Sequence, residues 1–260
     1  MVSHCASHDH HHHGTVGQNQ EYFNKEAAVY DAKNEKMLNK LIEEFRAKLD
    51  FIGVDWVDDD ESDAEGAKKT EHAKKSVKLL DYACGTGVVS RALAPYTTQC
   101  VGIDLSENMV AAYNARAENQ GLTPSEMHAH QGNICVPEDP NPQAFTSPEF
   151  SNFDVAVVGL GFHHFDDPAL AARRLAERLK TGGVLVILDF LPHDKPDASH
   201  PATSTITHHG FSEEHIRKIY EDAGVGKDFA LEELATVFHF SKENDTEVRR
   251  KIFMARGTKA

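Results

Sequence analysis

Between residues 77 and 190, short apolar runs alternate with segments of helical periodicity, and this alternation constrains the fold more than any other feature. The runs predicted to be strands are 77–83, 99–105, 126–131, 153–160 and 184–190. Runs that are apolar almost throughout are typical of strands in a parallel sheet, which helices cover on both faces. Strands and helices that alternate in this order predict an α/β fold.

Helix boundary signals lie between these strands. Ser106 is predicted to cap the helix that follows the second strand. Asp167 followed by Pro168 predicts the start of a later helix, and Gly182-Gly183 predicts where that helix stops.

The chain is expected to close with two antiparallel strands. The strand-like runs 229–240 and 248–255 are separated by the short polar segment 241–247. A parallel crossover needs a dozen or more residues, so a hairpin is the simplest connection. The sequence therefore predicts one α/β domain with a mostly parallel seven-stranded sheet, a C-terminal antiparallel hairpin and helices on both faces.

The N-terminal third divides by composition. Residues 1–19 are predicted to form a disordered His-rich tail, with a cloning remnant or a metal-binding tract as alternatives. Residues 20–53 are predicted to be helical because their apolar residues follow helical spacing. Residues 54–75 carry segregated charge and predict a solvated loop. The main domain is expected to span residues 76–260.

Overall charge and cysteine usage narrow the possible partners and compartment. The formal net charge of −14 with neutral histidine disfavours nucleic acid as the substrate. No apolar run approaches the roughly 18–20 residues that span a bilayer. The N-terminus lacks the features of a secretory signal, and the four cysteines show no paired spacing. These features predict a cytoplasmic protein without a membrane segment, with the nucleus as the alternative.

A ligand site is predicted where the first strand turns into a helix. Ala83, Gly85 and Gly87 are small enough for the backbone to approach a ligand closely, although glycines also simply make tight turns. Asp104 ends the next strand, where a carboxylate can accept both hydroxyls of an adenosine ribose. Together these features predict a nucleoside-containing cofactor.

Two residues distinguish between the candidate cofactors. A nicotinamide dinucleotide fingerprint requires a third glycine, and Ser90 occupies that position. Asp81, just before the loop, would repel a pyrophosphate and attract a cationic amino-acid group. S-adenosylmethionine carries an ammonium and a sulfonium but no phosphate, so the charge favours this methyl donor.

Five segments in order resemble the motifs of class I S-adenosylmethionine-dependent methyltransferases: 79–87, 101–109, 132–134, 160–165 and 180–183. The resemblance covers about residues 76–255 and is closest to the ubiquinone/menaquinone-biosynthesis type of small-molecule methyltransferase. It implies a Rossmann-like methyltransferase fold and S-adenosyl-L-methionine as the cofactor. It also implies that the helical segment 20–53 forms a lid over the cofactor.

The resemblance also assigns cofactor-binding roles. It implies Asp81 at the methionine ammonium, Ala83, Gly85 and Gly87 along its backbone path, Asp104 at the ribose, Leu105 and Met109 beside the adenine, Asn133 and Ile134 at the adenine edge, and Leu160 at the end of the fourth strand. Asn133 departs from the more usual aspartate. Its amide oxygen is expected to accept a hydrogen bond from the exocyclic amine of adenine.

Histidines supply the candidate catalytic groups. His163 and His164 follow the fourth strand, where the resemblance implies the transferred methyl group, and histidine titrates near neutrality. Either residue is a candidate general base, and the alternative is that both cap the strand or pack on the cofactor. The remaining histidines in the later loop match no zinc motif, so no metal site is predicted: His193, His200, His208 and His209.

The predicted activity is methyl transfer to an O, N, S or C centre of a small metabolite. No Asn/Asp-Pro-Pro-Tyr/Phe segment follows the fourth strand, which weakens a nucleic-acid or glutamine target. Two alternatives stay open: a regulatory or scaffold protein that retains the cofactor pocket and acts through protein partners, and a protein methyltransferase.

Overall fold

The computed structural model describes residues 14–57, 75–194, 201–241 and 247–260. The strands are β1 (Lys78–Tyr82), β2 (Gln99–Asp104), β3 (Met127–Gln131), β4 (Phe153–Gly159), β5 (Leu179–Phe190), β6 (Lys227–Ser241) and β7 (Glu247–Thr258). The helices are α1 (Thr15–Glu26), α2 (Tyr30–Ala47), α3 (Leu49–Ile52), α4 (Val88–Leu93), α5 (Glu107–Asn119), α6 (Pro168–Arg178) and α7 (Glu213–Asp222). None of these described helices is both long and apolar enough to cross a bilayer.

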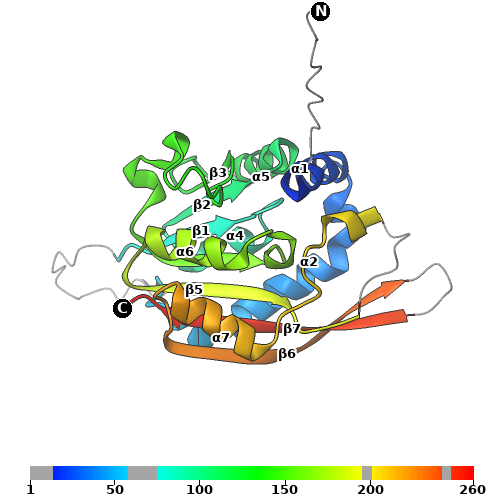
Figure 1. Cartoon of the computed structure of the whole chain (residues 1–260). Coiled ribbons are helices and arrows are strands. Elements are labelled where there is room, and N and C mark those ends of the chain that lie inside the picture. The colour runs from blue at the N-terminus through cyan, green and yellow to red at the C-terminus, as the bar shows by residue number, and fades with distance from the viewer. Residues whose placement is uncertain (1–13, 58–74, 195–200, 242–246) are drawn as a thin grey trace, which may run out of the picture.

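All seven strands form one sheet in the order β3-β2-β1-β4-β5-β7-β6 (Figure 1). Strands β1 to β5 pair in parallel, whereas β7 runs antiparallel to both β5 and β6. The predicted α/β architecture with a C-terminal antiparallel hairpin is therefore confirmed. The order reverses between β1 and β4, and ligands of open α/β sheets bind at the carboxyl ends of the strands near such a reversal.

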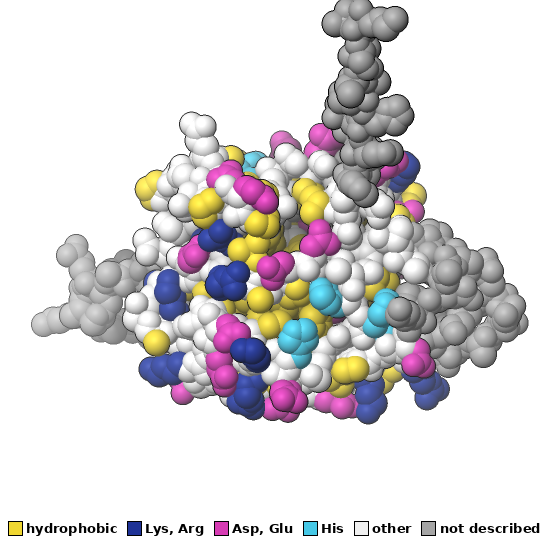
Figure 2. All heavy atoms as spheres, viewed as in Figure 1, with side chains coloured by type: hydrophobic (Ala, Val, Ile, Leu, Met, Phe, Trp, Pro, Cys, Tyr) yellow, Lys and Arg dark blue, Asp and Glu magenta, His cyan; other side chains and the backbone are white. Residues whose placement is uncertain are grey.

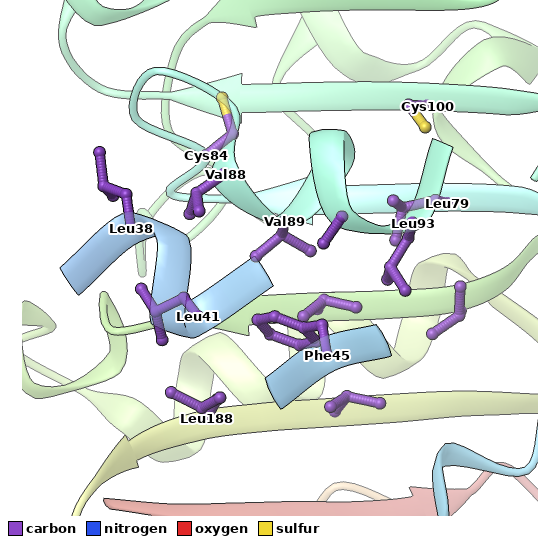
Figure 3. Close-up of a cluster of buried hydrophobic side chains, with 14 of the residues drawn as sticks. Leu38, Leu41, Phe45, Leu79, Cys84, Val88, Val89, Leu93, Cys100 and Leu188 are labelled. Atoms are coloured by element: carbon purple, nitrogen blue, oxygen red, sulfur yellow. The ribbon is translucent and has the colours of Figure 1, made fainter. Parts of the chain in front are cut away.

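Helices pack on both faces of the sheet, and each face has its own apolar core. On one face, Leu38, Leu41 and Phe45 of α2 point toward Val88 and Val89 of α4 (Figure 3). On the other face, α6 and α7 cover the strands with a second buried cluster. Helix α2 is thereby fixed against the domain, which makes the N-terminal segment part of the fold.

The junction between α6 and β5 differs from the sequence prediction. The helix ends at Arg178, and Gly182-Gly183 lie within β5 instead of stopping the helix. Leu179 is buried and pairs with Phe153, so the chain is already extended there. The register shifts beyond this pair, and Gly182 adopts a φ of +79°. The glycines thus allow the strand to shift its register, and the sequence alone does not distinguish this role from that of ending a helix.

The N-terminal boundary also needs correction. Helix α1 begins at Thr15, so residues 15–19 are helical and not part of the predicted tail 1–19. Asn19 is buried, and its Nδ2 donates a hydrogen bond to the carbonyl of His164 over 3.2 Å. A long-range contact therefore orders this part of the chain. The rest of the tail and most of the charged loop, residues 1–13 and 58–74, lie outside the described residues.

Candidate functional site

A cavity of about 1580 Å³ lies at the carboxyl ends of the parallel strands. The loops after β1, β2, β4 and β5 form one side of its wall, and helices α1 and α2 form another. Residues of β7 contribute to the wall next to β5. Figure 2 shows hydrophobic side chains gathered at the centre of one face of the molecule, with acidic, basic and histidine side chains around them.

The loop after β1 adopts an unusual backbone. Ala83, Gly85 and Gly87 all have positive φ values, of 55°, 52° and 90°. A Cβ atom on Gly85 would meet nothing within 4 Å, and Gly85 lines the cavity together with Ala83. A Cβ atom on Gly87 would lie 2.6 Å from the ring of Tyr113. Gly87 is therefore needed for packing against α5 and lies behind the cavity wall.

Asp104 ends β2, as the sequence predicted, and its side chain lines the cavity. Its Oδ2 accepts the N–H of Gly85 and its Oδ1 accepts the N–H of Ser106, both over 2.8 Å. Burial raises the pKa of this carboxyl, and these two hydrogen bonds oppose the rise. Each carboxylate oxygen retains a further lone pair, so the side chain can still accept two ligand hydroxyls. Ser106 itself caps α5.

Asp81 does not reach the cavity wall, contrary to its expected contact with a ligand ammonium. It is 1% exposed, and its Oδ2 accepts hydrogen bonds from the N–H and hydroxyl of Ser90 over 3.0 and 2.7 Å. Its Oδ1 has no hydrogen-bond partner within the described residues. Burial raises the pKa of Asp81 to about 7 against the effect of the Ser90 bonds. Asp81 therefore stabilises the first turn of α4 through Ser90, from a buried position behind the glycine loop.

Asn133 lines the cavity with its amide orientation fixed by the protein. Its Oδ1 accepts the backbone N–H of Cys135 over 2.8 Å and the hydroxyl of Tyr82 over 2.9 Å. Because a backbone N–H can only donate, the oxygen must face Cys135. The amide oxygen is therefore already occupied, and Nδ2 is the group that Asn133 can offer to a ligand. This reverses the polarity that the sequence predicted for Asn133.

The four remaining residues predicted to bind the cofactor separate into two groups. Leu105, Met109 and Leu160 line the cavity. Ile134 is fully buried in the apolar core beneath α6 and α7, so its side chain lies behind the wall. Leu160 has a φ of +59° at the turn that follows β4. That turn leads directly into the short helix Phe162–His164, which carries the two candidate catalytic histidines.

His163 forms a buried pair with Asp189. The ring Nδ1 of His163 lies 2.8 Å from Asp189 Oδ1, and Asp189 Oδ2 accepts the N–H of His163 over 3.0 Å. The N–H of Phe190 also donates to Asp189 Oδ1 over 2.7 Å. Burial raises the pKa of Asp189, but His163 and these hydrogen bonds outweigh it and hold the pKa below its usual range. A carboxylate acceptor at Nδ1 leaves Nε2 of His163 as the nitrogen that can take up a proton.

His164 has a different environment. Its Nδ1 lies 2.7 Å from the carbonyl oxygen of Thr205, so Nδ1 carries the proton and donates. Its ring meets Phe23 of α1 edge to face at 5.3 Å. Desolvation and the neighbouring His163 lower the pKa of His164 to about 3, and its ring stays neutral near pH 7. The sequence grouped the two histidines, whereas the structure separates a carboxylate-paired ring from a neutral ring that contacts α1.

The N-terminal helices are tied to three loops of the sheet. Asp31 of α2 accepts the hydroxyl of Thr86 in the glycine loop over 2.6 Å and pairs with Arg116 of α5. Asn24 of α1 accepts the hydroxyl of Ser106 over 2.6 Å. With the Asn19 contact to His164, these bonds hold α1 and α2 over the cavity. Tyr22, Phe23 and Tyr30, which belong to the segment 20–53 predicted to form a lid, all line it.

The site residues that sequence reasoning missed are those whose partners are distant in the chain. Asp189 left a visible signal, because it is the only charged residue in the apolar run 184–190. Asp31 and Asn19 left none. Among the described residues, no three His, Cys, Asp or Glu side chains are grouped as a metal site would require. His200, one of the loop histidines, lies outside the described residues.

The cavity fits a phosphate-free adenosyl ligand better than a dinucleotide. Ser90 occupies the third glycine position, and its hydroxyl is engaged by Asp81. Arg116, a cation beside the glycine loop, is held by Asp31 and by the carbonyl of Thr86 over 2.5 Å. The free lone pairs of Asp104 suit ribose hydroxyls, and Nδ2 of Asn133 suits N1 of adenine.

Comparison with known proteins decides the family. Residues 37–226 match the family model described as a methyltransferase domain. The chain belongs to this methyltransferase family. Its membership confirms the resemblance of the five sequence motifs, and S-adenosylmethionine is the cofactor that the family implies.

The relatives of this methyltransferase span several organisms. It is 28% identical over 158 residues to the methyltransferase C1347.09 of Schizosaccharomyces pombe, covering 58% of this chain and 54% of the relative. It is 31% identical over 123 residues to demethylmenaquinone methyltransferase of Staphylococcus aureus, covering 45% and 44%. The chain thus spans about half the length of these curated relatives.

A solved structure extends the likeness over most of the fold. A Haloferax volcanii putative methyltransferase, solved in complex with the Trm112 methyltransferase activator, has a TM-score of 0.59 at 17% identity. The match covers 91% of this chain and 96% of that one. At this identity the likeness shows a common fold, and it confirms the predicted Rossmann-like methyltransferase architecture.

Proposed function

We propose that this methyltransferase transfers the methyl group of S-adenosylmethionine to a hydroxyl or amine of a small metabolite, with His163 as the general base. One observation carries the proposal: His163, whose ring is paired with the buried carboxylate of Asp189, lines the same cavity as Asp104 and the glycine loop. S-adenosylmethionine supplies an activated methyl group, so the protein chiefly aligns the reactants and removes a proton.

The cofactor end of the cavity has a defined set of partners in this proposal. Asp104 accepts the ribose hydroxyls, Asn133 donates to adenine N1, and Leu105 and Met109 pack against the adenine. Ala83 and Gly85 allow the methionine portion to approach the backbone. Asp81 supports this loop through Ser90 without touching the ligand.

The proton-transfer step uses the other end. Nε2 of His163 would accept the proton of an acceptor hydroxyl during methyl transfer, or would remove a proton from an acceptor ammonium beforehand so that the amine lone pair can attack. The C–S bond of the sulfonium would break to release S-adenosylhomocysteine, and Asp189 would stabilise the imidazolium. His164, with its pKa lowered to about 3, stays neutral and packs against α1. Residues of α1 and α2 exclude water from the reaction.

A small acceptor is supported by the lid. Tyr22, Phe23 and Tyr30 cover the cavity, leaving less access for a folded protein chain than an open groove would. The unpaired thiols of Cys84, Cys100 and Cys135 support a reducing compartment, the cytoplasm or the nucleus. The Haloferax volcanii neighbour, solved with an activator, favours a protein partner as a second possibility.

The test is incubation of the protein with methyl-labelled S-adenosylmethionine and a fractionated cell extract. We expect label in a low-molecular-mass product, and its loss in Asp189→Asn with cofactor affinity retained. Label found only in protein would show that the methyl acceptor is a protein and not a small metabolite. Cofactor binding without any labelled product would favour the regulatory alternative.

A further inference from the structure

A buried cation lies on β7, the strand between β5 and β6 in the sheet. It lies near His163, at the end of the cavity that we call the acceptor end. Arg250 of β7 is 8% exposed and lines the cavity. Burial lowers the pKa of its guanidinium. Arg250 also has contacts within the chain, so its position is fixed by the protein. A buried charge is costly unless it is paired and hydrogen-bonded, and a guanidinium has five N–H donors with which to hold more than one partner.

The alternation of β7 accounts for this position. Ile252 and Met254 lie two and four residues after Arg250 and pack into the apolar core beneath α2. Side chains at this spacing share one face of a strand, so Arg250 belongs to the same row. Arg250 is the first residue of this row and lines the cavity, whereas Ile252 and Met254 lie in the apolar core. Its cross-strand neighbour on β6 is Phe238, which is also buried.

Arg250 and the proposed base are both close to one aromatic ring. The guanidinium carbon of Arg250 lies 5.6 Å from the centre of the Phe190 ring. The His163 ring lies 5.2 Å from the same ring. The cation and the proposed base thus have the Phe190 ring as a common neighbour, and both line one cavity.

We infer that the methyl acceptor carries a carboxylate, and that Arg250 binds it while His163 faces the nucleophile. This inference rests on the proposed function. A planar guanidinium matches a carboxylate with two parallel hydrogen bonds, and such pairs are strongest where water is excluded. The apolar residues around Arg250, including Phe190 and Phe238, suit an aromatic or aliphatic body between the two polar ends.

The surrounding charges favour one carboxylate over a more highly charged group. Arg249 and Lys251 also line the cavity, but both are exposed to solvent, and Lys251 pairs with Glu233 over 2.6 Å. Asp194 also lines the cavity near Pro192 and His193, and it would disfavour a second negative charge. Among the described residues that line the cavity, Arg250 is therefore the cation that is buried, and it can define the class of acceptor.

The inference is tested on the labelled products formed from a metabolite extract with methyl-labelled S-adenosylmethionine. We expect the main labelled product to bind an anion exchanger at neutral pH and to lose this retention on chemical amidation of its carboxylate. With the purified acceptor, Arg250→Gln is expected to raise KM on the order of tenfold to a hundredfold, with kcat changed far less. Arg250→Lys should recover part of the loss.

Exposed Arg173 of α6 provides a matched control, because Arg173→Gln removes the same charge outside the cavity. Calorimetry with S-adenosylhomocysteine and a melting curve show whether each variant still folds and binds the cofactor product. Labelled products that are uncharged, or formed equally well by Arg250→Gln, would overturn the inference and leave the proposed function intact. Failure of the wild type to bind the cofactor or label any metabolite would instead overturn the proposed function.

Discussion

The cofactor end and the acceptor end of the cavity are built from different kinds of contact. At the cofactor end, Asp104 bonds Ser106 two residues away and Gly85 in the preceding loop. At the acceptor end, His163 meets Asp189 across two strands, and Asn19 reaches His164 from the first helix. Neighbouring loops thus hold the Asp104 carboxylate, while His163 and His164 depend on the assembled sheet and on α1. Helices α1 and α2 contact both ends, through Ser106 and Thr86 at one and His164 at the other. Variation in acceptor chemistry therefore needs no change in the glycine loop.

The largest expected effect tests the acceptor end. His163→Ala should lower turnover about 100-fold because it removes the proposed proton acceptor, while affinity for S-adenosylmethionine stays unchanged. Steady-state kinetics on the identified acceptor and calorimetry on the cofactor provide the two readings. His215→Ala, an exposed histidine on α7, is the control. Wild-type turnover in His163→Ala would remove the base from the mechanism.

The next effect tests the cofactor end. Asp104→Ala should weaken S-adenosylmethionine binding by about 2 kcal/mol, some thirtyfold, because two ribose hydroxyls lose their acceptor and the Gly85 loop loses its anchor. Asp222→Ala on the surface of α7 removes the same charge as a control. Isothermal titration of both variants measures the difference, and equal affinities would contradict the ribose assignment.

A smaller effect concerns the polarity of Asn133. Asn133→Asp replaces the Nδ2 donor that faces the ligand by a carboxylate oxygen. The other carboxylate oxygen can still accept the hydrogen bonds from Tyr82 and Cys135. A cofactor analogue with hypoxanthine carries a hydrogen on N1, so it should gain about tenfold in affinity relative to S-adenosylmethionine in this variant. Competition binding with both ligands measures the ratio. An unchanged ratio would mean that the amide does not face the base.

The link between the lid and the glycine loop should have a modest effect. Thr86→Val removes the hydroxyl that Asp31 accepts, so cofactor dissociation should accelerate about fivefold, equivalent to about 1 kcal/mol. Thr86→Ser retains the hydroxyl and should behave like the wild type. Stopped-flow release of S-adenosylhomocysteine gives the rates. Identical rates for Val and Ser would show that this bond does not hold the lid.

The pH dependence of stability tests the lowered pKa of His164. The pKa of His164 is about 3 in the folded protein and near 6.5 in the unfolded chain. As the pH falls, His164 is therefore protonated in the unfolded chain before it is protonated in the folded protein. Its contribution to stability is present above pH 6.5 and is lost as the pH falls toward 3, by at most about 1.4 kcal/mol per pH unit. His164→Gln should therefore show a smaller fall in Tm between pH 7.5 and 5.5. Equal falls in both proteins would contradict this.

The sheet and the cofactor loops were predictable because their signals are local. The strand after Ser76, the small residues near Gly85 and the carboxylate at Asp104 are read from consecutive residues. The bulge at Gly182 and the start of α1 at Thr15 were mispredicted because pairing across the sheet and a distant hydrogen bond decide them. The polarity of Asn133 depends on how Tyr82 folds back, which no spacing in the sequence reveals.

The most direct test is calorimetric titration of the purified wild-type protein with S-adenosylmethionine and, separately, with NAD. A cavity that offers Asp104 to a ribose and engages its nearby Arg116 elsewhere should bind one equivalent of S-adenosylmethionine and give no heat with the dinucleotide. Saturable binding of NAD with no response to S-adenosylmethionine would contradict the account from the glycine loop onward.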